Sequence, residues 1–395
     1  MPLIHMADML HHAYENHYAI GAFDVVSLDF ISGVMAAAEE KRAPVIISLA
    51  ESHFEYFDFE LLMIAVVRAA ERSTIPVAIH LDHGESLESA VRAVNFGCTG
   101  IMVDASSLPL SENIAQTRAV VDMAHACGIP VEGELGYVPG VEGEDAERHP
   151  GDVQYTTVDE ARRYIDETGA DFLAVSIGTV HGRMKGEPKL DIERLAQINQ
   201  ALKRPLVIHG GTGLREDQYS SLINNGVTKI NYYTALADAA GQRIKGNVES
   251  ETNCSYTSHI HGVAEAVQHE AAHCIDIWGC TERADEMLAS CRPWLPVEHV
   301  IFFNTEKLDV ASTEGMISEG KRVLGGIPGV QRVFAGHAVT EDSSYRHCWV
   351  VRFSARPVID SYRKHPAHQD FADNRFRPNA GDRLTIDFEE CNTEK

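Results

Sequence analysis

The sequence predicts an α/β protein in which a closed barrel of eight parallel strands and eight helices precedes a smaller α+β domain. Three observations carry this prediction. Eight short β-type runs alternate with helical patterns between residue 18 and about residue 235, which is the order that a (β/α)8 TIM barrel requires. Several of these runs are continuously apolar, as expected for parallel strands buried on both faces. The chain has 395 residues, more than the roughly 250 that a barrel alone needs.

Each predicted strand is a short apolar or β-branched run. The strands are expected at Tyr18–Phe23, Val45–Leu49, Val77–Leu81, Gly100–Val103, Val131–Leu135, Phe172–Ser176, Leu206–Ile208 and Val227–Ile230. The helical patterns between them include Leu28–Glu40, Phe59–Arg72, Leu87–Asn95 and Asn113–Ala126. Four strands directly follow a proline, where a preceding helix must already have ended: Pro44, Pro76, Pro130 and Pro205. A doubly wound open sheet is the alternative, but its Gly-x-Gly-x-x-Gly fingerprint is absent after the first strand.

After the eighth unit, the sequence predicts a polar stretch at Asn247–Ser258 and a helix at Val263–Ala289, with a second change of pattern near residues 292–296. The remaining elements follow the order βαββαβ of a ferredoxin-like unit. They are expected at His299–Phe303, Asp309–Val323, Gln331–Val339, His347–Ser354, Arg356–Lys364 and Arg383–Phe388. We therefore expect one domain over residues 1–292 and a second, the tail, over residues 297–391.

The composition excludes several classes of protein. The net charge of −24 argues against a nucleic-acid or anionic membrane partner. The longest apolar run, Leu61–Val67, has seven residues, and a membrane span needs about 20. The N-terminus lacks the pattern of a signal peptide. The eight cysteines form no Cys-x-x-Cys pair, which argues against a disulfide framework and a thiolate zinc site. We expect a cytoplasmic protein.

Histidines follow the carboxyl ends of three predicted strands, which is the end of a barrel that carries the active site. His83 follows the third strand, His181 the sixth and His209 the seventh, and Glu134 lies on the fifth. Three imidazoles and a carboxylate are ligands that suit zinc, cobalt or iron. The alternative is that one or more of these histidines belongs to the core.

Glycine-rich loops follow the same strand ends. His209-Gly-Gly-Thr-Gly213 follows the seventh strand, and Asn231-Tyr-Tyr-Thr234 follows the eighth, where barrels of this kind usually bind phosphate. His181–Gly186 adds a third such loop with two cations. The segment Gly136–Asp152 is long and acidic, which is typical of a mobile lid that carries a catalytic acid or base, or of a solvated loop.

Together, these motifs resemble those of the class II, zinc-dependent fructose/tagatose-bisphosphate aldolases. The resemblance is collinear from about residue 1 to 290. The segments that carry it are Gly21–Phe23, Leu81–Gly84, Glu132–Gly136, Ile177–Leu190 and His209–Gly213. It implies a metal-dependent lyase of carbohydrate metabolism, as in glycolysis, that cleaves or forms the C–C bond of a ketose (bis)phosphate to give dihydroxyacetone phosphate and an aldehyde.

The resemblance also implies a role for individual residues. Asp82 would protonate the aldehyde oxygen, and Glu142 on the lid would move the proton at the carbon nucleophile, with Glu144 as an alternative. The implied metal positions are His83, His181, His209, in some states Glu134, and Asp104 as an auxiliary position. The implied contacts to substrate and phosphate are Gly182, Lys185, Gly210, Gly211, Thr212, Asn231 and Thr234.

Some positions depart from the family pattern and leave the identity of the phosphosugar open. Asp24 stands where the family usually has asparagine, and Ala50 replaces a serine, which removes a hydroxyl group near the substrate. After the eighth strand, Tyr232, Tyr233 and Ala235 replace smaller or acidic residues.

The tail resembles the stress-responsive dimeric α/β-barrel (Dabb) domain. Ile327-Pro-Gly-Val330 and Tyr362-x-x-His365-Pro-x-His368 carry this resemblance. In that family, two sheets pack face to face across a two-fold axis. We expect Val300, Phe302, Val351 and Phe353 to form one apolar sheet face that a second copy covers, and thus a homodimer or a higher homo-oligomer. A ligand-binding or enzymatic tail, with His299 and His365 in a cavity, is the alternative.

The chemistry can also be stated without the family. Breaking a C–C bond beside a carbonyl leaves a carbanion, which one divalent metal, Zn²⁺ or else Co²⁺ or Fe²⁺, stabilises as an enediolate. The resemblance leaves room for a monovalent cation as well. A Schiff-base aldolase would instead need a desolvated lysine, for which Lys229 is the candidate. A catalytically silent protein that binds a metal and a phosphosugar, with the tail as its interaction domain, is the non-enzymatic alternative.

Overall fold

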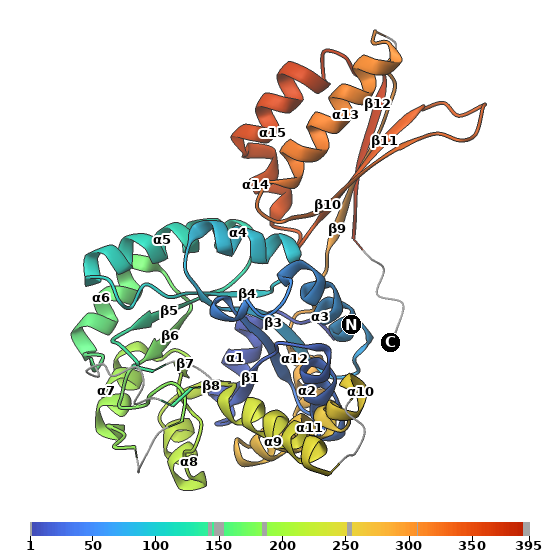
Figure 1. The fold of residues 1–395 in the computed structure, drawn as a ribbon. Coiled ribbons are helices and arrows are strands. Elements are labelled where there is room, and N and C mark those ends of the chain that lie inside the picture. Colours follow the sequence, from blue (N-terminus) through green and yellow to red (C-terminus); the bar gives the residue numbers. More distant parts are fainter. Residues whose placement is uncertain are drawn as a thin grey trace. The chain divides into compact units, whose positions relative to one another are not determined.

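The computed structural model describes residues 2–140, 144–145, 154–183, 188–250, 255–305 and 307–389. The chain forms two compact units (Figure 1). The larger unit comprises Met1–Ala90, Cys98–Val121 and Pro130–Pro293, and the smaller comprises Trp294–Lys395 with Val91–Gly97 and Asp122–Ile129. Within the described ranges, no helix is both long and apolar enough to cross a membrane.

The larger unit contains a closed barrel of eight strands, which confirms the TIM-barrel prediction. Every neighbouring pair is parallel, and β8 pairs with β1 to close the barrel. The strands are β1 (Ile20–Asp24), β2 (Val45–Ala50), β3 (Val77–Gly84), β4 (Gly100–Val103), β5 (Val131–Leu135), β6 (Phe172–Val175), β7 (Leu206–Ile208) and β8 (Val227–Tyr232). Nearly all of their residues are buried, because the barrel interior covers one face and the helices cover the other.

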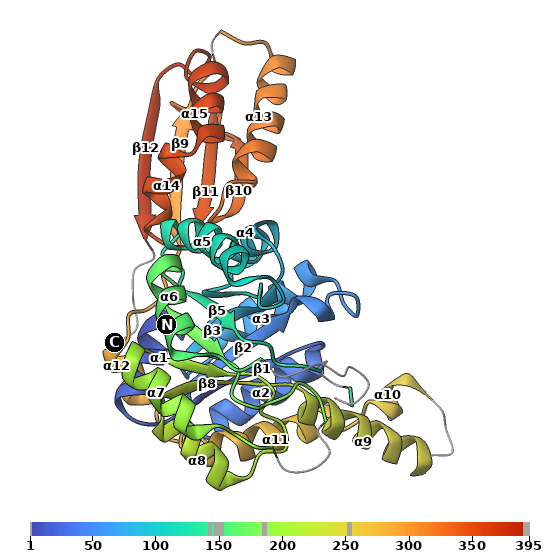
Figure 2. The same cartoon turned by 90° about the vertical axis from the view of Figure 1, so that its left-hand side faces the viewer.

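Helices surround the barrel (Figure 2). They are α1 (Met6–Glu15), α2 (Leu28–Glu40), α3 (Phe59–Arg72), α4 (Leu87–Phe96), α5 (Leu110–Ala126), α6 (Val158–Thr168), α7 (Ile192–Leu202), α8 (Glu216–Asn224) and α9 (Thr234–Ser250), with the short helix η1 (Glu51–His53) after β2. Side-chain caps explain where several begin. Ser27 accepts from the Phe30 N–H and Asp58 from the Leu61 N–H, which satisfies amides that have no partner within the helix.

The segment after the barrel differs from the prediction in one respect, the continuity of its last helical run. Helix α9 continues to Ser250, through the first part of the expected polar stretch, and α10 (Tyr256–His259) follows. The single helix expected at Val263–Ala289 is two helices, α11 (Val263–Ile277) and α12 (Ala284–Ser290). The reason is a turn between them, in which Gly279 has a φ of 71°, a value that an L side chain rarely adopts.

The tail has the predicted βαββαβ order. Its sheet is antiparallel with strand order β10-β11-β9-β12, and its helices lie on one face of the sheet (Figure 1). The elements are β9 (Val297–Phe303), α13 (Val310–Gly325), β10 (Val330–His337), β11 (His347–Phe353), α14 (Val358–Lys364), α15 (Pro366–Phe371), η3 (Ala372–Phe376) and β12 (Arg383–Glu389).

The prediction of one apolar sheet face is correct for Val300 and Phe302 but wrong for Val351 and Phe353. Val300 pairs with Val350, and His299 pairs with Val351, so Val351 and Phe353 share a face with His299, not with Val300. Val351 and Phe353 are fully buried on the face that the helices cover. The open face instead combines Val300 and Phe302 with residues of the other three strands. Its most exposed apolar side chains are 38–49% accessible: Phe302, Phe334, Leu384, Ile386 and Phe388.

Candidate active site

The three predicted histidines meet at the carboxyl end of the barrel. His83 lies near the end of β3, His181 follows β6 and His209 directly follows β7. One ring nitrogen of each lies within 4.8 Å of the other two, and the ring centroids are 4.6 to 5.7 Å apart. The three histidines therefore share one site, as the sequence predicts.

A bulge in β3 lets two consecutive residues reach this site. Leu81 pairs with Ile101 of β4, but Gly84 pairs with Val103, so β3 has one extra residue over this stretch. In a regular strand, Asp82 and His83 would point to opposite faces. His83 has a φ of 46°, and its Nε2 lies 3.8 Å from Oδ2 of Asp82. The bulge thus brings both side chains to the mouth of the barrel.

The second ring nitrogen of each histidine has its own partner. Nδ1 of His83 lies 2.7 Å from Oδ2 of Asp104, Nδ1 of His181 donates to the Val138 carbonyl at 3.1 Å, and Nε2 of His209 lies 3.1 Å from Oε1 of Glu132. Such partners hold metal-binding histidines in one orientation and tautomer. The remaining nitrogens converge, since Nε2 of His83 and Nδ1 of His209 are 2.9 Å apart.

The residues present fit a divalent metal. His83, Asp104 and Glu134 form a second group with suitable spacing, next to the three histidines. Oε2 of Glu134 is buried and makes no hydrogen bond within the described part of the chain. Burial, together with the negative charge of Asp104, raises the pKa of Glu134 well above its usual value, and a bound cation opposes such an effect. Burial and the neighbouring His83 lower the pKa of His209, which favours the neutral, ligand form.

Beneath the histidines lies a buried chain of hydrogen bonds and ion pairs. Nζ of Lys229 contacts Oε2 of Glu132 at 2.8 Å and donates to Oδ1 of Asn231 at 2.6 Å. The Asn231 amide then donates to Oδ1 of Asp82 at 2.6 Å. Because Glu132 also contacts His209, this chain links a histidine of the metal group to Asp82. Burial raises the pKa of Asp82, but nearby positive charges, above all that of His83, outweigh burial, and the pKa lies below its usual value.

The sequence offered Glu132 only as part of the motif Glu132–Gly136 and Lys229 only as the lysine of a Schiff-base aldolase, and it did not predict the ion pair between them. One signal was available, because a lysine in a strand as apolar as β8 must be paired when it is buried. Two other predicted residues, Glu142 and Lys185, lie outside the described residues. In the tail, His299 contacts Asp387 at 2.5 Å, whereas His365 accepts the Ala367 N–H at the start of α15.

The predicted phosphate loops lie beside the histidines. Gly182 and Gly210 have φ values of 81° and 66°, and a Cβ atom on Gly210 would lie 2.2 Å from the Val180 carbonyl oxygen. Only glycine fits there, so the backbone comes unusually close. Thr234 is buried at the first turn of α9, and the N-terminus of a helix favours an anion. Arg183 is paired with Asp238 and Asp145.

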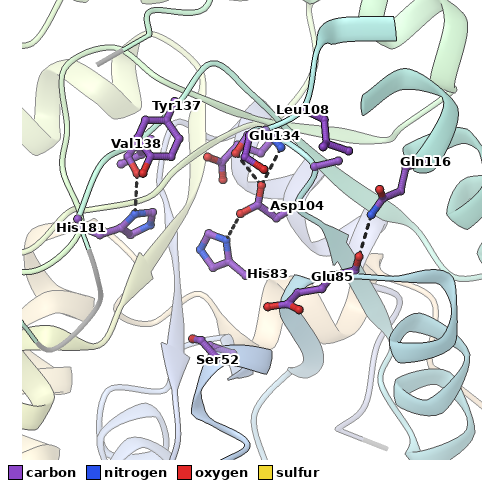
Figure 3. A pocket seen from close by; sticks show the side chains of 15 residues that line it. Ser52, His83, Glu85, Asp104, Leu108, Gln116, Glu134, Tyr137, Val138 and His181 are labelled. Atoms are coloured by element: carbon purple, nitrogen blue, oxygen red, sulfur yellow. Dashed lines mark hydrogen bonds and ion pairs between the residues drawn. The ribbon is translucent and has the colours of Figure 1, made fainter. Parts of the chain in front are cut away.

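A cavity of about 510 Å³ opens on one side of the histidines. Figure 3 shows His83 and His181 in its wall, with the carboxylates of Asp104 and Glu134 near them. Among the described residues, those that line it lie on β2 to β6, on the loops that follow these strands or on α5, and none of them lies on the loops after β7 and β8. They are Ala50, Ser52, His83, Glu85, Asp104, Ala105, Ser106, Ser107, Leu108, Gln116, Glu134, Tyr137, Val138, Gly140 and His181.

Comparisons with known proteins agree on the barrel. The family model described as "Fructose-bisphosphate aldolase class-II" matches residues 4–283. The "Fructose-bisphosphate aldolase" of Staphylococcus aureus is 35% identical over 288 residues, which cover 72% of this chain and 100% of that protein. The "Probable fructose-bisphosphate aldolase" of Bacillus subtilis is 40% identical over 237 residues, which cover 59% of this chain and 82% of that protein.

Solved structures and a second family model extend this result. The crystal structure of the YdjI aldolase from Escherichia coli K12 has a TM-score of 0.65 and 34% identity, and the match covers 72% of this chain and 100% of that one. A putative fructose-1,6-bisphosphate aldolase from Coccidioides immitis has a TM-score of 0.65 and 30% identity, and that match covers 72% of this chain and 98% of the other. The model described as "Stress responsive A/B Barrel Domain" matches residues 297–390.

Proposed function

Because the chain belongs to the class II fructose-bisphosphate aldolase family and carries a C-terminal Dabb domain, we propose that it is a lyase that cleaves and forms the C–C bond of a ketose phosphate. The products of cleavage are dihydroxyacetone phosphate and an aldehyde. The observation that carries this proposal is the convergence of His83, His181 and His209 on one point at the barrel mouth.

These three histidines would hold the divalent metal that the family uses. Glu134 is the further ligand that we propose, because its Oε2 is buried and makes no hydrogen bond in the described part of the chain. When bound, the metal acts as a Lewis acid and stabilises negative charge that develops on the ketone oxygen. We propose Zn²⁺, with Co²⁺ or Fe²⁺ as substitutes, and leave room for a monovalent cation. Asp104 holds the ring of His83 in its orientation in this arrangement. We also propose Asp104 as an auxiliary metal ligand.

Asp82 is the acid and base that we propose for the oxygen on the aldehyde side. Its lowered pKa keeps it ionised, so it can accept the proton of the substrate hydroxyl as the bond breaks and return it in the reverse reaction. The Asn231 amide holds Oδ1 of Asp82, and Oδ2, which lies 3.8 Å from Nε2 of His83, is the oxygen that we propose for this transfer. For the proton at carbon, we propose Glu142, with Glu144 as the alternative.

The loops after β6, β7 and β8 are the phosphate site that we propose. The backbone approaches closely at Gly210, and α9 begins at Thr234, which together favour an anion. The full proposed set is Gly182, Lys185, Gly210, Gly211, Thr212, Asn231 and Thr234.

A chelator experiment tests the metal-dependent function. Removing the metal should abolish cleavage of ketose phosphates, and Zn²⁺ or Co²⁺ should restore it. Borohydride added together with substrate should leave the enzyme active, because the ammonium of Lys229 is held by Glu132 and Asn231 and is not free to form a Schiff base. Full activity in metal-free protein, or inactivation by borohydride, would overturn the proposal. A silent binding protein would retain metal but show no cleavage and no exchange of the α-proton.

For the tail, we propose self-association through the open sheet face, which makes the chain a homodimer or a higher homo-oligomer. Five apolar side chains on that face are at least 38% exposed in a single copy, and an apolar patch of this kind usually marks an interface. The cytoplasm remains the compartment that we propose, on the sequence evidence.

A further inference from the structure

The cavity beside the histidines is acidic. Its wall contains Glu85, Asp104 and Glu134, and no lysine or arginine lines it among the described residues. Asp104 and Glu134 lie close to the histidines and are part of the candidate metal group. Glu85 differs from them, since it lies one residue beyond the end of β3 and is exposed. Figure 3 shows its carboxylate on the side of the cavity that Ser52 also lines.

Glu85 has a fixed backbone and a carboxylate that is available for a ligand. Its N–H donates to Oε2 of Glu51 at 2.8 Å, and its carbonyl accepts from Nε2 of Gln116 at 2.8 Å. Within the described part of the chain, its carboxylate makes no hydrogen bond and no ion pair. The backbone that carries this carboxylate is therefore fixed in the cavity wall, and no described residue neutralises its charge.

The position of the cavity relative to the phosphate loops says which part of the substrate enters it. Most of the proposed phosphate contacts lie at or after the ends of β7 and β8: Gly210, Gly211, Thr212, Asn231 and Thr234. The cavity is lined from β2 to the loop after β6, and among the described residues it shares only His181 with the remaining phosphate loop. His83 and His181 line the cavity and His209 directly follows β7, so the candidate metal group borders both regions. A ketose with its C1 phosphate on the loops and its carbonyl at the histidines must extend its other end, which becomes the aldehyde, into the cavity.

We propose that this acidic cavity selects an uncharged polyhydroxy aldehyde, so that the preferred substrate is a ketose 1-phosphate and not a ketose 1,6-bisphosphate. Hydroxyl groups can donate to Glu85, and the hydroxyls of Ser52 and Ser107 line the same wall. A second phosphate would place two like charges together, which is strongly unfavourable at a specific site. The inference rests on the proposed aldolase function. It differs from the printed names of the relatives, which give a fructose bisphosphate as the substrate.

The test compares matched substrates that differ only in the distal phosphate. Fructose, tagatose and sorbose 1-phosphates are assayed against their 1,6-bisphosphates, and glyceraldehyde against glyceraldehyde 3-phosphate in the reverse reaction with dihydroxyacetone phosphate. We expect kcat/KM to be at least about tenfold higher for the monophosphate in each pair that reacts. Glu85→Lys should shift this ratio toward the bisphosphate by at least about tenfold, and Glu85→Gln by less. Glu88→Gln, an exposed acid three residues away that does not line the cavity, should leave the ratio unchanged.

Each outcome decides the inference. A wild-type preference for the bisphosphate in the reacting pairs overturns it while leaving the aldolase function in place. A ratio that Glu85→Lys does not change overturns the role of Glu85. If no pair reacts and the α-proton of dihydroxyacetone phosphate does not exchange in metal-loaded protein, the aldolase function fails and the inference fails with it.

Discussion

Lys229 has a fully buried ammonium group in the middle of the barrel, and two neighbours depend on it. It neutralises Glu132, which holds His209, and it orients the amide of Asn231, which holds Asp82. The ammonium of Lys229 thus helps to position both a histidine of the candidate metal group and the proposed acid, Asp82.

Removing this cation leaves the buried carboxylate of Glu132 without its ammonium partner, with histidine rings as its remaining neighbours. Lys229→Met should therefore lower the free energy of unfolding by about 3 to 5 kcal/mol, as measured by denaturant unfolding. The double variant Lys229→Met with Glu132→Gln should recover much of this loss, because neither charge then remains. The pairing would be refuted by a single variant as stable as the wild type, or by a double variant no more stable than the single one.

Asp82 and Glu142 should separate two steps of the reaction. Asp82→Ala should reduce cleavage by about 10²- to 10⁴-fold, which is typical for loss of a general acid or base. It should retain exchange of the α-proton of dihydroxyacetone phosphate with solvent, because that exchange does not use the proton on the aldehyde oxygen. Glu142→Ala should lose exchange as well, as followed by NMR in deuterated water. Wild-type behaviour of Glu142→Ala would move the role to Glu144.

Single residues could be predicted where the strand order alone decides their place. His83, His181 and His209 follow strand ends, and every carboxyl end of a parallel barrel lies on the same rim. The contact between Lys229 and Glu132 could not be predicted in this way. It depends on which side chains of β8 and β5 face each other across the interior, and a single strand does not contain that information.

At the scale of elements, Glu39 ties the end of α2 to the turn before β3. Its carboxylate accepts from the Ser73 hydroxyl at 2.6 Å and from the Thr74 N–H at 2.7 Å. Burial raises the pKa of Glu39, but these hydrogen bonds outweigh burial, and the pKa lies below its usual value. A lowered pKa stabilises the folded protein above the unfolded-state value of about 4.3, and this contribution is lost as the pH falls through the folded-state value.

Glu39→Gln should therefore destabilise the protein by about 1 kcal/mol at pH 7. The difference from wild type should shrink steadily as the pH falls below about 4, because the native carboxyl is then protonated too. Unfolding by urea at a series of pH values measures this. Glu15→Gln, on the exposed side of α1, is the control and should show no such dependence. A difference that grows at low pH would contradict the assignment.

Elements could be predicted wherever the local pattern is sufficient. The bounds of α2 and α3 match the prediction because a capping residue begins each one. The break between α11 and α12 was missed, since the helical pattern continues across Gly279. The open face of the tail was assigned wrongly because it depends on the register between β9 and β11, and the sequence of each strand shows only which residues alternate.

At the scale of the whole molecule, the open sheet face of the tail controls assembly. Phe302→Asp or Ile386→Asp should weaken self-association by at least about tenfold, because each places a charge within a desolvated interface. Sedimentation equilibrium of the full chain measures this. Val339→Asp is the control, since its side chain is 98% exposed and follows the end of β10. An unchanged oligomer in both face variants would rule out this face as the interface.

The extra residue in β3 has a consequence at the level of the gene. It sits between Leu81 and Gly84, where Asp82 and His83 must point the same way although they are neighbours. An in-frame loss of one codon here would let β3 and β4 pair without interruption, so selection for a folded product would not remove it. Selection for turnover would remove it at once, because the only residues between Leu81 and Gly84 are Asp82 and His83, and the deletion would therefore take away either the acid or the first histidine. A one-codon deletion in this strand would therefore keep the barrel fold and abolish the aldolase chemistry.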